Sequence, residues 1–212
     1  MIRIFQTSIF FIFFNLIYGQ SEFIYILGNV QDAGLPHIGC QHKFCKEKFN
    51  EFEEYFTTSI AVVDPLERKY ILFEATPDLP YQLNYLEKEI FNEFLLPESI
   101  YITHAHIGHY TGLMYFGREA LGAKNIMVKV LPKMGDFLKT NGPWNQLVDI
   151  NNIQIQNLNF GLNTNELRNI TVTPIQVPHR DEYSETAGFI IEGRNKKALF
   201  IPDIDKWEKW NK

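Results

Sequence analysis

Three histidines, His104, His106 and His109, fall within six residues near the middle of the chain. Imidazole nitrogen is a common ligand of zinc and other transition metals in proteins. Any one of these histidines alone would more often be a loop or hydrogen-bonded residue, but their spacing favours a metal site. Residues two apart in an extended segment point the same way, so His104 and His106 can hold one ion while His109 is displaced toward a second position.

The segments on either side of the histidines would position them. Ser99–Thr103 is rich in β-branched and aromatic residues, which predicts a buried strand. Apolar residues at near-helical spacing predict a helix over Thr111–Leu121, ended by Gly122. The histidines would then lie in a strand-to-helix turn at the carboxyl end of a sheet, where α/β folds place their ligands.

Two further candidate ligands follow later segments that have the composition of strands. His179 comes directly after Val172–Val177, and Asp203 comes after Ala198–Ile201. Because such strand ends can converge on one rim of an α/β sheet, both side chains could reach the histidine pair. A lone histidine or aspartate here would more often be a surface or turn residue, so their candidacy depends on this convergence.

A second chemical cluster lies near the N-terminus, where the only two cysteines, Cys40 and Cys45, flank His42. Cys-x-His-x-x-Cys supplies three zinc-type ligands on one short loop, as structural zinc sites often do. A disulfide between the two cysteines is the competing interpretation, because exported proteins live in oxidising compartments. We favour zinc, with His37 as a possible fourth ligand.

Length and composition place limits on the rest of the protein. At 212 residues and 45% hydrophobic content, the chain can bury one sizeable core, which predicts a single domain over residues 20–212. A net charge of −5 without a basic block argues against a nucleic-acid partner. The other expected strands are Phe23–Leu27, Thr57–Val63, Lys69–Glu74, Asn125–Leu131, Ile153–Leu158 and Ala187–Glu192, and the other expected helices are Pro80–Phe94 and Lys133–Lys139.

Residues 1–19 have the pattern of an export signal. Arg3 gives a weakly positive start, residues 4–17 are mostly apolar, and Gly19 offers a small residue for cleavage. An uncleaved membrane anchor is the alternative, but the run is short of the roughly 20 apolar residues of a membrane-spanning helix. We therefore expect a secreted or periplasmic protein that keeps no stable membrane span.

The order of these motifs resembles the metallo-β-lactamase family, whose core pattern is His-x-His-x-Asp-His followed by a later histidine and aspartate. The runs 27–36 and 103–113 are most similar to the coenzyme PQQ synthesis protein B branch, and the cysteine loop resembles a structural zinc loop of related members. The resemblance covers the chain from about Phe23 onward and implies an αββα sandwich.

Carried over by position, the resemblance implies that His104, His106 and His179 bind a first metal, that Asp203 bridges toward a second, and that His109 serves the second. This chain departs from the pattern because position 108 is glycine instead of aspartate, and because it stops at residue 212, before the pattern's final histidine. We therefore expect one active-site metal, and we expect the sequence to be a fragment that is incomplete at its C-terminal end.

The function expected from this reading is metal-dependent hydrolysis of a small molecule. A zinc held by three histidines activates water, and Asp203 is the first choice as acid/base helper, with Asp32 a distant second. The same ligands also suit iron, so the alternatives are chemistry on a quinone precursor, as the branch suggests, or a non-catalytic protein that binds a small molecule.

Overall fold

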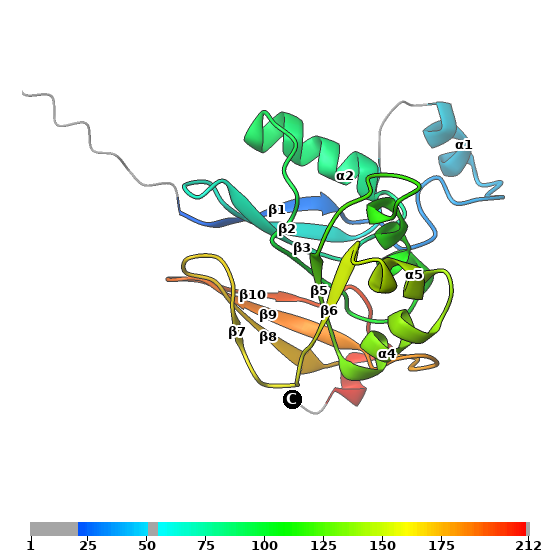
Figure 1. Cartoon of the computed structure of the whole chain (residues 1–212). Helices are drawn as coiled ribbons and strands as arrows, with labels where there is room; N and C mark the ends of the chain where they lie inside the picture. The colour runs from blue at the N-terminus through cyan, green and yellow to red at the C-terminus, as the bar shows by residue number, and fades with distance from the viewer. Residues whose placement is uncertain (1–20, 51–54, 211–212) are drawn as a thin grey trace, which may run out of the picture.

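Two β-sheets packed face to face form the centre of the molecule (Figure 1). The computed structural model describes residues 21–50 and 55–210, so the expected export signal lies outside the described residues. The sheets and helices confirm the mixed α/β sandwich expected from the sequence. The strands are β1 (Phe23–Gly28), β2 (Ser59–Asp64), β3 (Lys69–Phe73), β4 (Ser99–Tyr101), β5 (Ile126–Val130), β6 (Ile153–Asn157), β7 (Thr164–Asn165), β8 (Thr171–Gln176), β9 (Ala187–Glu192) and β10 (Lys197–Phe200).

The larger sheet has six strands in the order β1-β2-β3-β4-β5-β6. Strands β1, β2 and β3 pair antiparallel, whereas β3 through β6 run parallel to one another. Every residue of β2 is buried, as expected for a continuous apolar strand covered on both faces. The smaller sheet is antiparallel, in the order β10-β9-β8-β7.

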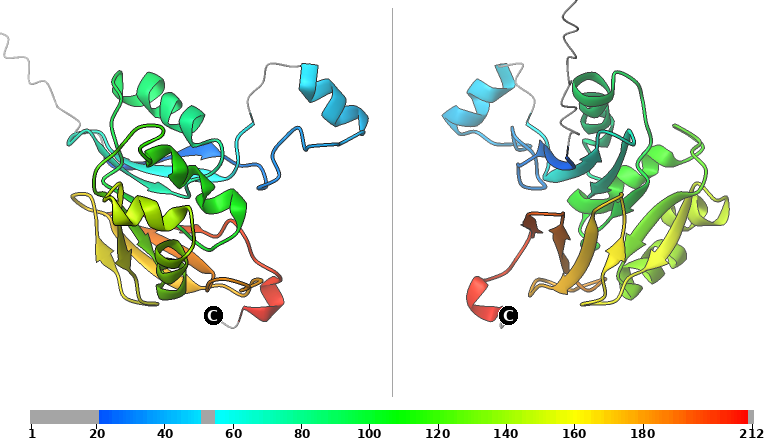
Figure 2. Two further views of the ribbon diagram at one scale, coloured as in Figure 1. Left: turned by 45° about the vertical axis from the view of Figure 1, so that its right-hand side comes forward. Right: turned by 90° about the vertical axis from the view of Figure 1, so that its left-hand side faces the viewer.

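Helices cover the outer face of the six-stranded sheet, where leucines and other apolar residues from both layers form one core (Figure 2). A second core fills the space between the sheets and is centred on aromatic rings. Phe73 stacks on Tyr101 with ring centroids 4.9 Å apart, and Phe189 meets both rings edge to face. The α-helices are α1 (Lys43–Asn50), α2 (Leu79–Tyr85), α3 (Ile107–Tyr110), α4 (Pro132–Thr140) and α5 (Trp144–Asp149).

The segment after the histidines differs from the helix expected over Thr111–Leu121. The helical segment begins earlier, with α3 at Ile107, continues as a 3₁₀ helix over Thr111–Phe116, and then gives way to turns. His109 therefore lies on a helix and not in the turn before it. The helical segment ends at Phe116, with Gly117 as its C-cap, so Gly122, which was expected to end the helix, lies instead in the turns that follow, with a positive φ of 62°.

Two short helices, α1 and α5, were not expected from the sequence. In contrast, the helix expected over Pro80–Phe94 is present as α2 followed by a π-helical turn, Leu86–Phe91. Asn92 ends it in the left-handed conformation with φ 56°. Within residues 21–50 and 55–210, we find no helix with the length and apolar character needed to cross a membrane.

Candidate metal centre

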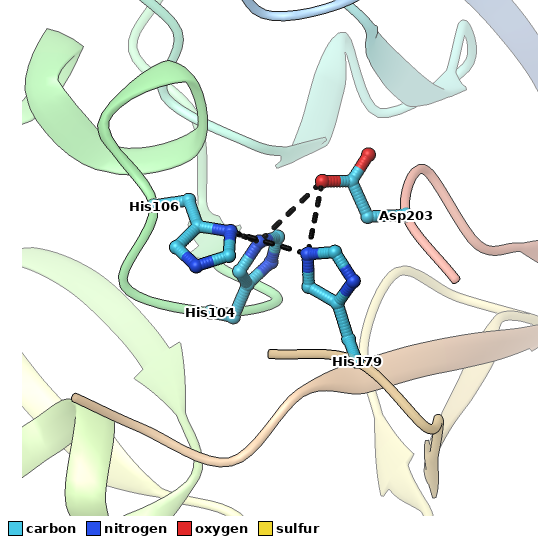
Figure 3. Close-up of side chains that lie close together, drawn as sticks. All are labelled: His104, His106, His179 and Asp203. Atoms are coloured by element: carbon cyan, nitrogen blue, oxygen red, sulfur yellow. Dashed lines mark hydrogen bonds and ion pairs between the residues drawn. The ribbon is translucent and has the colours of Figure 1, made fainter. Parts of the chain in front are cut away.

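Four side chains from both sheets converge at one end of the sandwich (Figure 3). His104 and His106 follow β4 in the large sheet, whereas His179 follows β8 and Asp203 follows β10 in the small sheet. One ligand atom from each residue lies within 4.8 Å of the corresponding atoms of the others. The four residues picked out by spacing thus meet between two sheets, not on the rim of one sheet.

The separations between these atoms suit a single metal ion. Nδ1 of His106 lies 2.8 Å from Nε2 of His104 and 3.2 Å from Nε2 of His179. Oδ2 of Asp203 lies 3.6 Å from Nε2 of His104 and 3.4 Å from Nε2 of His179. Ligand atoms bound tetrahedrally to zinc at about 2.1 Å are about 3.4 Å apart, so small adjustments would allow all four to share one ion.

A carboxylate fixes which nitrogen of His106 faces the centre. Nε2 of His106 lies 2.8 Å from the carboxylate of Glu182, which can only accept a hydrogen bond. A neutral His106 therefore carries its proton on Nε2 and presents the lone pair of Nδ1 to the other ligands. This is the arrangement by which metal-ligating histidines are oriented in proteins.

The other two histidines of the cluster have similar outer partners. Nδ1 of His104 is hydrogen-bonded to the hydroxyl of Thr103 at 2.8 Å. Nδ1 of His179 lies 3.3 Å from a carboxylate oxygen of Asp205 but makes no hydrogen bond to it. In each ring, Nε2 is thereby left to face the centre. The donor set and its outer partners fit a metal ion.

Backbone hydrogen bonds hold the loops that carry these ligands. The amide of Ala187, at the start of β9, donates to the carbonyl of Thr103 at 3.0 Å. The amide of Ala105 donates to the hydroxyl of Ser184 at 2.9 Å. The amide of Asp205 donates to the carbonyl of Pro178 at 2.9 Å. The first two bonds tie the histidine turn of the large sheet to the small sheet.

His109 lies beside the four-residue cluster but not within it. Its ring is 2% exposed, with Nε2 3.4 Å from Oδ2 of Asp203 and Nδ1 3.8 Å from Oε2 of the fully buried Glu74. Neither ring nitrogen makes a hydrogen bond to any residue that the structure describes. The ring therefore lies between two carboxylates, with Asp203 facing Nε2 and Glu74 facing Nδ1.

Burial and mutual charge perturb the titration of this centre in the metal-free protein. Burial, reinforced by the neighbouring imidazoles, lowers the pKa of His104 to about 2. Contact with the His109 ring is the largest influence on Asp203 and lowers its pKa to about 2. Burial also lowers the pKa of His109, but Asp203 and Glu74 outweigh it and raise that pKa to about 10. At neutral pH, His109 is therefore positive, Asp203 negative and His104 neutral.

The cysteine loop corrects the expectation of a structural zinc. Cys40 and Cys45 form a disulfide, so neither sulfur is available as a thiolate ligand. His42 and His37 are both exposed, and neither belongs to a metal-binding group within the part of the chain that the structure describes. The disulfide, which is the competing interpretation of the same residues, is the one that the structure supports.

Three acidic residues at the centre were missed by sequence reasoning: Glu182 beside His106, Asp205 beside His179, and Glu74 beside His109. Glu74 directly follows β3, and Asp205 lies two residues after Asp203, so both occupy positions typical of site residues. Acidic residues are common in loops, however, and no local pattern distinguishes one that faces a ligating imidazole from one that faces water.

Comparison with known proteins identifies the family and the fold. A family described as "Beta-lactamase superfamily domain" matches residues 69–211. No curated protein sequence matches the chain. Among solved structures, Zn²⁺-bound PqqB from Methylobacterium extorquens is similar, with a TM-score of 0.71, 18% identity, and coverage of 85% of this chain and 65% of that chain.

Two further structures share the fold. A diphosphatase from the PhnP family has a TM-score of 0.57 and 22% identity, and covers 81% of this chain and 62% of its own. Unliganded yeast PDE1 has a TM-score of 0.50 and 15% identity, with coverage of 84% and 63%. This chain spans less than two thirds of the length of each of the three structures, and at these identities the likeness is one of fold.

Proposed function

We propose that this chain, which belongs to the beta-lactamase superfamily, is a metal-dependent hydrolase of a small molecule. The observation that carries the proposal is the convergence of His104, His106, His179 and Asp203 from two sheets onto one point. Such a set, in which His104 and His106 also have outer hydrogen-bond partners, has the composition of a catalytic zinc site with three nitrogen ligands.

The ligands of the proposed ion are the three imidazoles, with the Asp203 carboxylate beside them. Bound there, zinc would lower the pKa of a water molecule to about 7 and polarise a carbonyl or phosphoryl oxygen of the substrate. Zinc is proposed first because imidazole and carboxylate are its usual ligands, and iron is the second choice because the same ligands suit it.

Asp203 would position the attacking water. Its side chain is 33% exposed, so solvent reaches the carboxylate, whereas His104 is 1% exposed. Because contact with His109 lowers the pKa of Asp203 to about 2, the group is ionised at neutral pH. An ionised carboxylate accepts a hydrogen bond from water and orients it, but with such a pKa it is a weak proton acceptor. Its proposed role is therefore orientation first and proton transfer second.

Measurement of metal content and turnover on the purified chain would test this proposal. We expect zinc in the parent chain, and we expect His104→Ala to lower the zinc content by at least one ion per chain and abolish hydrolysis. Suitable substrates are a chromogenic β-lactam, a p-nitrophenyl ester and bis-p-nitrophenyl phosphate. His37→Ala, which removes an exposed histidine outside the cluster, is the matched control.

Two outcomes would contradict the proposal. Unchanged zinc content in His104→Ala would show that the cluster is not the metal site. Retained zinc with no turnover of any of the three substrate classes would favour the alternative in which the protein binds a small molecule without transforming it.

We also propose that the protein is exported. The support is the mostly apolar stretch at residues 4–17, preceded by Arg3 and followed by Gly19. N-terminal sequencing of the protein recovered from expressing cells would test this. A mature protein that begins at residue 20 is expected, and recovery of the intact N-terminus from the cell interior would contradict export.

A further inference from the structure

We propose that Arg180 binds an oxyanion of the substrate, a phosphate or a carboxylate, beside the metal ligands. This inference rests on the hydrolytic site proposed above and names the class of substrate that the site would select. Arginine suits this role because its guanidinium is always positively charged and presents five N–H donors in a planar fork, which matches two oxygens of a carboxylate or phosphate.

The first observation is the position of the guanidinium. Arg180 directly follows His179 in the loop after β8. Its Nη2 lies 3.5 Å from Nδ1 of His106, the ring nitrogen that the contact with Glu182 leaves facing the other ligands. Figure 3 shows that this nitrogen points toward His104 and His179. The guanidinium therefore lies at the edge of the candidate metal centre and not on a remote surface.

A metal ion at the centre would free the guanidinium for another ligand. Nδ1 of His106 has a single lone pair, which faces Arg180 in the structure and would be given to the ion when one is bound. Because one lone pair cannot serve both, Arg180 would turn its donors elsewhere. An oxyanion is a suitable partner, since one of its oxygens could bind the ion while another accepts a hydrogen bond from the guanidinium.

The acidic residue that contacts Arg180 leaves most of the guanidinium available. Nη1 of Arg180 lies 3.7 Å from Oε1 of Glu182, whose other oxygen is already hydrogen-bonded to His106 at 2.8 Å. The side chain of Arg180 is 63% exposed, and within residues 21–50 and 55–210 it makes no other ion pair. Dissolved ions therefore have access to its remaining N–H donors.

Charge at the centre gives a reason for a cation here. The carboxylates of Asp203, Asp205 and Glu182 lie beside the histidines and would repel an anionic substrate. In the part of the chain that the structure describes, Arg180 is the only lysine or arginine in hydrogen-bond contact with a metal-ligand histidine. Its positive charge would add to that of the metal and offset the neighbouring carboxylates.

Titration of oxyanions by isothermal calorimetry would test the assignment. The parent chain, Arg180→Gln and Arg180→Lys would be loaded with zinc, freed of unbound zinc, and titrated with inorganic phosphate and, separately, with acetate. Arg118→Gln is the matched control, because Arg118 lies outside the cluster, is 64% exposed and also contacts an acid, Glu119, at 3.3 Å. Elemental analysis would give the zinc content of each variant.

We expect Arg180→Gln to keep the zinc of the parent and to bind the anion about 10- to 100-fold more weakly, the loss that corresponds to one hydrogen bond between charged groups. Arg180→Lys keeps the charge but loses the planar fork, so its affinity should be intermediate. Arg118→Gln should bind as the parent does. Unchanged anion affinity in Arg180→Gln, or a zinc-loaded parent that binds neither ion, would overturn the assignment.

Turnover gives a second measurement. KM for bis-p-nitrophenyl phosphate, which carries a negative charge, should rise in Arg180→Gln, whereas KM for the neutral ester p-nitrophenyl acetate should not change. An equal rise for both substrates would show that Arg180 supports the site as a whole and does not select an anion, which would also overturn the assignment.

These outcomes separate the two proposals. If His104→Ala loses zinc while Arg180→Gln binds anions as the parent does, the hydrolytic site stands and only the role of Arg180 is wrong. If His104→Ala retains all of its zinc, the proposed hydrolytic site itself is wrong.

Discussion

Glu182 accepts a hydrogen bond from Nε2 of His106 at 2.8 Å, and the opposite nitrogen of that ring faces the metal-ligand cluster. Removal of this acceptor leaves the ring free to turn and to protonate on the wrong nitrogen. We expect Glu182→Ala to weaken zinc binding by about 10- to 100-fold, measured by competition with a chelator of known affinity. Glu192→Ala, in an exposed ion pair with Lys197, is the control and should bind as the parent does.

The titration of His104 and His109 together should give the metal-free chain a contribution to stability that is largest near pH 6.5. His104 has a pKa of about 2 in the folded chain and about 6.5 in the unfolded chain. Below pH 6.5 the unfolded chain therefore takes up a proton that the folded chain does not, and the free energy of unfolding decreases as the pH is lowered. His109 has a pKa of about 10 when folded, so its contribution is complete below pH 6.5 and is lost as the pH rises toward 10.

Urea unfolding in the presence of a chelator between pH 4 and pH 10 would measure this profile. His104→Asn should flatten its acid side, since it removes the group responsible. Asp203 adds a loss of stability only at lower pH, as its carboxylate is protonated between about pH 3.8 and pH 2. Stability that rises steadily from pH 6.5 to pH 10 would contradict the assignment to His109.

A buried ion pair joins the two sheets and should be costly to break. Lys129 of β5 pairs with Glu166, which follows β7, and their side chains are 10% and 5% exposed. The hydroxyl of Tyr101 also donates to Glu166 at 2.5 Å. Glu166→Ala would leave the Lys129 charge buried without its partner, and we expect a loss of about 3–5 kcal/mol in the free energy of unfolding.

The comparison for that prediction is an exposed ion pair. Arg68 and Glu93 have side chains that are 50% and 54% exposed, so Glu93→Ala should change stability by no more than about 1 kcal/mol. The double variant Lys129→Met with Glu166→Leu should be less destabilised than Glu166→Ala, because no unpaired charge remains. Equal losses in the single and double variants would show that charge burial is not the cause.

The disulfide should be independent of the metal centre. Thiol titration of the unreduced chain should detect neither Cys40 nor Cys45, since they are bonded to each other. The double variant Cys40→Ser with Cys45→Ser should retain the zinc content of the parent. A lower zinc content in that double variant would support a structural zinc at the cysteines and contradict the disulfide.

Much of the fold follows from local patterns in the sequence. The strand Ser99–Thr103 and the histidines after it were predicted because composition and spacing are local properties, and β4 and its turn lie where expected. The family inferred from these motifs is also confirmed. The start of α3 was predicted four residues too late, because Gly108 is a poor helix former and the apolar spacing begins only after it.

The rest of the centre depends on contacts between distant segments. Glu182 and His106 are 76 residues apart, and no local pattern joins them. Asp32 packs so closely against Gly108 that a Cβ atom at position 108 would lie 2.0 Å from the Cβ of Asp32. No local sequence pattern predicts this contact, because it depends on how a loop crosses a helix. The cysteine loop was misassigned for a different reason: the residue types suit both a disulfide and zinc, and only their positions in three dimensions decide between them.

The placement of the ligands on separate sheets bears on how the protein reaches its native state. His106 and His179 are 73 residues apart in the chain, so bringing them together lowers the conformational entropy of the chain. Favourable contacts between the two sheets must offset that loss. We therefore expect the ligand set to assemble late in folding, once the two sheets have packed together. A metal ion bound at this junction would link the two sheets, and the fraction of chains that hold an ion would measure how many have packed their two sheets together.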